Sequence, residues 1–226
     1  MPVTTQPPCW SSIRSSVKGH RPEPQAERVQ PGDKKKEKAH TDKKTIGKGD
    51  EMIFIYHDFG GTHTTSMAAA IHLRLLPDRE WTDEEILSIP DFNQLKKKDA
   101  GHLFFKGTDH DGHDVYTIGK RSSKYVLPAM KDVSKMLLSR YDRDGKIIFS
   151  NTSPVVPPVM TAGGFLARGL GLDAVGVPLL VRGAKQCRVY LEKLVDETKR
   201  SAHESHAGRI LDLENKYYQY KKGKKL

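Results

Sequence analysis

The sequence contains little cysteine and has no long apolar run. Its 226 residues include two cysteines, Cys9 and Cys187, which form no Cys-x-x-Cys pair. A disulfide framework or a thiolate zinc site is therefore not expected, and a reducing cytosol is the default compartment. The longest apolar candidate, Val175–Val181, is too short to span a membrane. Arg14 and Lys18 precede no apolar stretch of the kind that a secretory signal requires. We therefore predict a cytoplasmic protein without a membrane span.

Standard phosphate and nucleophile motifs are also missing. The sequence lacks the Gly-Lys-Ser/Thr ending of a Walker loop, the Gly-x-Gly-x-x-Gly fingerprint, the Cys-x5-Arg phosphatase loop and the Gly-x-Ser-x-Gly elbow. The His- and Asp-rich segment Asp109–Asp114 lacks EF-hand spacing, so it predicts a solvated hairpin turn rather than a calcium site. No motif therefore identifies a cofactor or a reaction.

Positive charge is concentrated at the two ends of the chain. The formal net charge is +10, yet residues 51–200 carry 21 basic and 19 acidic residues. Residues 1–50 hold eleven Lys or Arg against six Asp or Glu, with many Pro, Ser and Gln. We predict a disordered basic leader over 1–50, an α/β domain over 51–200 and a basic tail over 201–226 with a short helix at Ile210–Tyr220. Nucleic acid is a candidate partner through these tails alone.

One stretch predicts a strand, a turn and a helix in succession. Met52–Tyr56 is a short apolar run rich in β-forming residues, which is typical of a strand in a covered parallel sheet. Gly60 and Gly61 permit a sharp turn. Thr62 or a later threonine can cap the helix that follows, and we predict that this helix continues to Pro77.

Strand and helix patterns alternate along the rest of the domain. Thr82 and Glu85 have the capping-box spacing that begins a short helix. Asp91 can cap another short helix that ends at Leu95, and the lysine run at 96–98 that follows is typical of a surface insertion. Asp111-Gly112 predicts a hairpin between two β-like runs. The remaining predicted elements are helices over 123–138, 158–170 and 184–200, and strands over 146–150 and 175–181.

This alternation predicts a three-layer α/β fold. Its sheet is mainly parallel, with helices on both faces and one β-hairpin, because right-handed crossovers on either side of the first strand would place the helices on both faces. In open sheets of this kind, ligands bind beyond the carboxyl ends of the strands.

Polar and basic residues follow each predicted strand at this edge. Free helix N-terminal amides with nearby Arg or Lys favour an anion, and we expect a phosphate-bearing small molecule. The candidate ligand-binding residues are Gly60, Gly61, Thr62, Thr64, Lys120, Arg121, Asn151, Thr152 and Arg182.

His57, Asp58 and His63 are the candidate catalytic residues. Histidine is the usual proton carrier near neutral pH. Two imidazoles and a carboxylate are also adequate ligands for zinc, iron or manganese, which leaves a metal site as an alternative. One observation argues against both catalysis and metal binding here: His57 and Asp58 are adjacent at the end of a strand, so their side chains would point apart. In the structural alternative, Asp58 caps the loop and one histidine is exposed.

Several motifs together resemble a known family. They are Ile-Tyr-His-Asp-Phe-Gly-Gly-Thr-His at 55–63, Ala-Ala-Ala-Ile-His-Leu at 68–73, Lys-Gly-Thr-Asp at 106–109, Val-Tyr-Thr-Ile-Gly at 115–119 and Gly-Gly-Phe-Leu-Ala-Arg-Gly-Leu-Gly-Leu at 163–172. The chain is similar over these segments to an uncharacterised, domain-of-unknown-function family found mostly in spore-forming and anaerobic Firmicutes. The resemblance implies a cytosolic bacterial protein and assigns no activity. Family members begin near the position of Met52, so the leader is a departure from the family pattern.

Three functions fit the sequence. The first is binding of an anionic small molecule at the strand ends, with a hydrolase or transferase reaction as an extension. The second is a non-enzymatic interaction module that uses the basic tails, and the third is a metal protein. The sequence decides neither the substrate nor the oligomeric state.

Overall fold

The described part of the chain contains one five-stranded sheet. The computed structural model describes residues 51–140, 145–205 and 208–221, so the predicted leader lies outside the described residues. The strand order is β2-β3-β1-β4-β5. The strands are β1 (Glu51–Asp58), β2 (Leu103–Thr108), β3 (Asp114–Gly119), β4 (Gly145–Asn151) and β5 (Ile210–Leu213).

The sheet is parallel except at one edge. β1 pairs in parallel with both β3 and β4, and β4 pairs in parallel with β5. β2 pairs antiparallel with β3 and forms the predicted hairpin. Because β1 lies between β3 and β4, the chain leaves β1 toward one side of the sheet and later returns to its other side. Such a reversal of strand order opens a crevice at the carboxyl ends of the strands.

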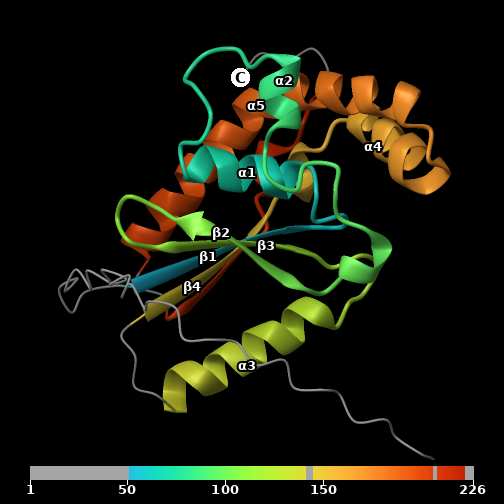
Figure 1. Cartoon of the computed structure of the whole chain (residues 1–226). Helices are drawn as coiled ribbons and strands as arrows, with labels where there is room; N and C mark the ends of the chain where they lie inside the picture. Colours follow the sequence, from blue (N-terminus) through green and yellow to red (C-terminus); the bar gives the residue numbers. More distant parts are fainter. Residues whose placement is uncertain (1–50, 141–144, 206–207, 222–226) are drawn as a thin grey trace, which may run out of the picture. The chain divides into compact units, whose positions relative to one another are not determined.

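Helices cover both faces of the sheet, which confirms the predicted three-layer α/β class. α1 (Thr64–His72) and α5 (Asp173–Glu204) lie on one face and α3 (Val126–Arg140) on the other (Figure 1). The shorter elements are α2 (Asp83–Leu87), α4 (Pro158–Gly164), the 3-10 turns η1 (Lys97–Asp99), η2 (Ser153–Val155) and η4 (Lys216–Tyr218), and the π-helical turn η3 (Phe165–Gly169). Among the described residues, no helix combines the length and apolar character needed to cross a membrane.

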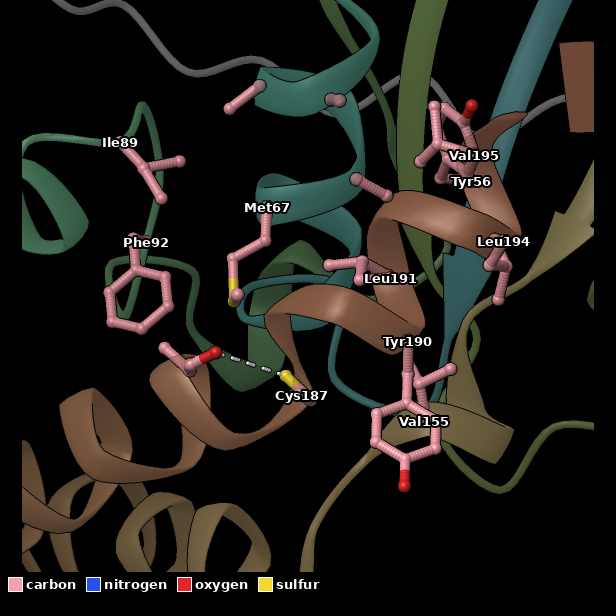
Figure 2. Close-up of a cluster of buried hydrophobic side chains, with 14 of the residues drawn as sticks. Tyr56, Met67, Ile89, Phe92, Val155, Cys187, Tyr190, Leu191, Leu194 and Val195 are labelled. Carbon is pink, nitrogen blue, oxygen red and sulfur yellow. Dashed lines mark hydrogen bonds between the residues drawn. The ribbon is translucent and has the colours of Figure 1, made fainter. Parts of the chain in front are cut away.

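The larger core lies between the sheet and the α1/α5 layer. Tyr56 of β1, Met67 of α1 and Leu191 of α5 are fully buried there, and Figure 2 shows this cluster. The Cys187 thiol donates to the carbonyl of Ala184 at 3.5 Å. Burial raises the pKa of Cys187 to about 12, so the thiol stays protonated and is a core group rather than a reactive one.

The predicted strand over Val175–Val181 is wrong, because this segment forms the first turns of α5. Pro178 lies inside the helix. A short apolar run with β-branched residues does not distinguish a strand from a buried helix. Tertiary packing decides the outcome here: a Cβ at Gly176 would lie 2.5 Å from the amide nitrogen of Ala167, and one at Gly183 would lie 2.6 Å from the Cβ of Met160. These glycines let α5 contact α4 and η3 directly.

The predicted helix over Ile210–Tyr220 is also wrong. Ile210–Leu213 forms the edge strand β5, and η4 follows it. This segment has the short β-branched and apolar pattern of a strand, and pairing with β4 extends the sheet beyond residue 200.

The predicted end of α1, its predicted threonine cap and the predicted helix after Asp91 are wrong, while the capping box of α2 is confirmed. The N-cap residue of α1 is His63, which makes no side-chain cap. α1 ends at His72 rather than near Pro77, and Arg74 adopts a left-handed φ of 54°. Asp91 has a φ of 63° and begins a turn rather than a helix. The capping box of Thr82 and Glu85 forms as predicted, with both reciprocal hydrogen bonds present.

A close glycine contact positions the loop after β1. Gly61 has a φ of 74°, and a Cβ there would lie 2.5 Å from the amide nitrogen of Gly119. In return, a Cβ at Gly119 would lie 2.6 Å from the carbonyl oxygen of Gly60. The loop that follows β1 can therefore lie directly on the end of β3 because neither Gly61 nor Gly119 has a side chain.

We expect Gly61→Ala to destabilise the protein more than Gly171→Ala. Gly171 has a similar φ of 71°, but a Cβ there would have no atom within 4 Å, so this position isolates the backbone strain. That strain costs about 1–2 kcal/mol, and the contact with Gly119 should raise the loss for Gly61→Ala to roughly 3 kcal/mol or more. Urea unfolding at neutral pH measures both changes. Equal losses for the two variants would contradict the proposed contact.

Candidate functional site

A cavity of about 810 Å³ lies at the carboxyl end of β1. Its walls come from the β1–α1 loop, the segment before η1, the turn after β3, and the helical region from η2 through η3. This is the position at which the strand order predicts a ligand crevice. The described lining residues include Asp58, Phe59, Gly60, Thr62, His63, Thr64, Leu95, Lys96, Lys97, Arg121, Ser153, Val156, Met160, Phe165, Arg168 and Gly169.

A hydrogen-bonded cluster forms the base of this cavity. The buried carboxylate of Asp58 accepts from the amide of Gly61 and, at 2.9 Å, from the hydroxyl of Thr64. The Thr64 hydroxyl lies 3.0 Å from that of Thr152, whose amide donates to the carbonyl of His57 at 2.9 Å. Burial raises the pKa of Asp58, and the hydrogen bonds from Gly61 and Thr64 oppose that rise. The cluster connects β1, α1 and the segment after β4.

The N-terminus of α1 faces the cavity. His63 is its N-cap residue and makes no side-chain cap, and both His63 and Thr64 line the cavity. The first helical hydrogen bond runs from the amide of Met67 to the carbonyl of His63 at 3.0 Å, so the amides before Met67 have no partner within the helix. The first turn contains no acidic residue. This end of the helix is therefore electropositive toward the cavity.

Four cationic side chains line the cavity: Lys96, Lys97, Arg121 and Arg168. Among the described lining residues, Asp58 alone is acidic. Its carboxylate oxygens already accept hydrogen bonds from Gly61 and Thr64. The Nε of Arg121 is buried and has no hydrogen-bond partner among the described residues. The cavity consequently has an excess of positive charge.

Asn93 connects two of these groups. The Nε of Arg168 donates to the Oδ1 of Asn93 at 2.8 Å, and the Nε2 of His63 lies 3.3 Å from the same oxygen. Burial lowers the pKa of His63 to about 4, and Arg168 and Arg121 contribute to that lowering, while the Asn93 hydrogen bond opposes it. His63 is therefore neutral at pH 7.

The structure brings half of the sequence-predicted residues to the cavity. Asp58, Gly60, Thr62, His63, Thr64 and Arg121 line it. Gly61 and Thr152 belong to the hydrogen-bonded base beneath it.

The other predicted residues lie elsewhere. His57 points to the α3 face, where the charges of Asp212 and Lys131 affect it, so it projects away from Asp58 as neighbouring strand residues do. Asn151 donates to Glu214 at 2.9 Å and Lys120 does not line the cavity. Arg182 is exposed on α5 rather than at a strand end, because the segment before it is helical and not the predicted strand.

The metal alternative finds no support in the geometry. His57, Asp58 and His63 do not bring three ligand atoms together. Among the described residues, the group with suitable spacing is Asp109, His110 and Asp111 in the β2–β3 turn. His110 and Asp111 are exposed, and acidic turns of this kind are common without an ion.

Sequence reasoning missed Lys96, Lys97, Phe59, Phe165 and Arg168. The lysine run has the composition of a surface insertion, yet its segment returns to the β1–α1 loop, where the amide of Asn93 donates to the carbonyl of Thr62 at 3.1 Å. The pattern around Phe165 and Arg168 predicts a helix and no site. Both belong to the π-helical turn η3, for which the sequence carries no local signal.

The fold and the cavity together define a three-layer α/β domain with an electropositive crevice at the strand ends. Residues 53–200 match the family model described as "Protein of unknown function (DUF3189)", and the chain belongs to this family. Neither the curated proteins nor the solved structures gave a match. The predicted membership of an uncharacterised family is thus confirmed.

We expect the buried His57 to lower the free energy of unfolding as the pH falls below about 6.5. His57 is 1% exposed, both of its ring nitrogens lack a partner among the described residues, and burial lowers its pKa to about 4. Between about pH 6.5 and 4 the unfolded state therefore binds a proton that the folded state does not, so stability falls as the pH falls. At pH 5 this effect amounts to about 2 kcal/mol relative to pH 7.

Urea unfolding of His57→Leu at pH 7 and pH 5 tests this expectation. From pH 7 to pH 5, the free energy of unfolding of the variant should fall by about 2 kcal/mol less than that of the unmodified protein. His110→Leu changes an exposed histidine and should keep the original pH dependence. An unchanged pH dependence in His57→Leu would show that this imidazole is not the group responsible.

Proposed function

We propose that this protein binds a phosphate-bearing anionic small molecule in the cavity above β1. The observation that supports this proposal is the gathering of four cationic side chains and an uncapped helix N-terminus around one cavity. A volume of about 810 Å³ is typical of small-molecule sites.

The two arginines offer complementary ways to hold the anion. Arg168 has one nitrogen oriented by Asn93, so its remaining guanidinium donors are available to a ligand. Arg121 follows the end of β3 and lines the same cavity. Arg binds phosphate oxygens through paired hydrogen bonds, and the first-turn amides of α1, which have no partner within the helix, add further donors. The hydrogen bonds to Asp58 reduce the repulsion that a free carboxylate would exert on the anion.

A hydrolase or transferase reaction on the bound anion is the catalytic extension of this proposal. We assign proton transfer to His63, because its imidazole lines the cavity and is neutral at pH 7. A pKa of about 4 makes it a weak base, and the charge of a bound anion would raise that pKa toward neutrality. The orientation of His57 toward the α3 face and the capping bonds of Asp58 argue against these two residues as its partners.

We expect Arg121→Gln and Arg168→Gln each to weaken binding of inorganic phosphate by about tenfold or more, because each removes a charged hydrogen-bond donor from the anion. Isothermal titration calorimetry at low ionic strength measures the affinity. Added sodium chloride should weaken binding to the unmodified protein, because the attraction to the cations is screened.

Arg182→Gln is the matched control, since Arg182 is exposed on α5 and does not line the cavity. This variant should bind phosphate with unchanged affinity. The proposal fails if millimolar phosphate produces no binding signal, or if the Arg182 variant loses as much affinity as the cavity variants.

A further inference from the structure

Two exposed phenylalanines line the same cavity as the cationic groups. Phe59 directly follows β1 and is 57% exposed, and Phe165 begins η3 and is 62% exposed. Leu95, Val156 and Met160 add apolar surface to the lining. An inorganic anion would contact the cations and leave this apolar surface in water.

An arginine lies near each of the two phenylalanines in the structure or in the sequence. The guanidinium carbon of Arg121 lies 5.6 Å from the ring centroid of Phe59. Phe165 and Arg168 belong to the same π-helical turn and both line the cavity. The cavity wall that contains Phe59 and the wall formed by η3 each thus combine a phenyl ring with an arginine.

Gly169 keeps the ring of Phe165 close to the backbone. A Cβ at Gly169 would lie 3.2 Å from the Cδ2 atom of Phe165, so a larger residue would press on the ring. Gly169 itself lines the cavity. The Phe165 ring thus has a backbone support on one side while most of its surface stays accessible.

We infer that the ligand is a phosphate ester of a flat aromatic group, either a nucleobase or an aryl ring. This inference rests on the proposed phosphate site. The phosphate binds Arg121, Arg168 and the N-terminus of α1, and the aromatic group packs against Phe59 or Phe165. Aromatic rings favour offset or edge-to-face contact with other rings, and a stacked base gains binding energy without sequence-specific hydrogen bonds. A sugar phosphate would leave the exposed surface of both phenyl rings in water.

Calorimetric titrations with matched ligands test the inference. The probes are inorganic phosphate, ribose 5-phosphate, butyl phosphate, phenyl phosphate and adenosine 5′-monophosphate. We expect phenyl phosphate or the nucleotide to bind about tenfold tighter than ribose 5-phosphate, in line with the contribution of one stacked ring. Preference for the nucleotide over phenyl phosphate identifies a nucleobase ligand, and the reverse order identifies an aryl ligand.

Substitutions at the rings separate this inference from the phosphate site. Phe165→Ala and the double variant Phe59→Ala/Phe165→Ala should lose the preference for aromatic esters and retain the affinity for inorganic phosphate. Phe105→Ala is the matched control, because Phe105 is 56% exposed on β2 and does not line the cavity. It should keep the preference. Melting temperatures close to that of the unmodified protein verify that the exposed substitutions leave the fold intact.

Four results would overturn the inference. If phosphate binds but aromatic esters bind no tighter than ribose 5-phosphate, the phosphate site stands and the aromatic ligand is rejected. If butyl phosphate binds as tightly as the aromatic esters, the apolar surface recognises alkyl groups instead. If the double variant retains the preference, the two phenyl rings are not its source. Absence of binding to every probe rejects the phosphate site together with the inference.

Discussion

The buried carboxylate of Asp58 is the constraint on which the site depends. It accepts hydrogen bonds from Gly61 and Thr64, and a buried carboxylate without such donors would be strongly unfavourable. These bonds hold the loop after β1 in a tight turn against β3 and direct the N-terminus of α1 to the strand ends. The contact between Thr64 and Thr152 connects the same loop to the segment after β4. One hydrogen-bonded cluster thereby fixes the base of the cavity and the electropositive helix end that faces it.

The two faces of the sheet contribute unequally. The α1/α5 face contains most of the buried apolar residues. On the other face, Leu127 alone is buried among the described residues of α3. The cavity belongs to the better packed face. There, glycines at 163, 176 and 183 allow α4 and α5 to approach closely, which gives η3 a firm support. Arg168 and Phe165 therefore lie next to a packed helix pair rather than on a long loop, and a site built on such elements is more precise than one built on loops.

Local sequence patterns predicted most of the sheet. The strand-turn-helix unit at β1, the capping box at Thr82 and the hairpin at Asp111-Gly112 were predicted correctly, because each signal is contained within a few neighbouring residues. The errors occurred where the same pattern suits two structures. Val175–Val181 is apolar and β-branched, yet contact with α4 makes it helical, and Ile210–Leu213 becomes a strand because β4 offers a free edge.

The sequence by itself determined that a glycine turn joins β1 to a helix and that polar residues follow the parallel strands. Only the tertiary structure decided which of these residues meet. Adjacent residues of a strand point to opposite faces, so Asp58 joins the cavity and His57 does not. The approach of Lys96, Arg121 and Arg168 joins segments far apart in the chain. Their meeting depends on strand order and helix packing, which are set by long-range contacts rather than by the local sequence around each residue.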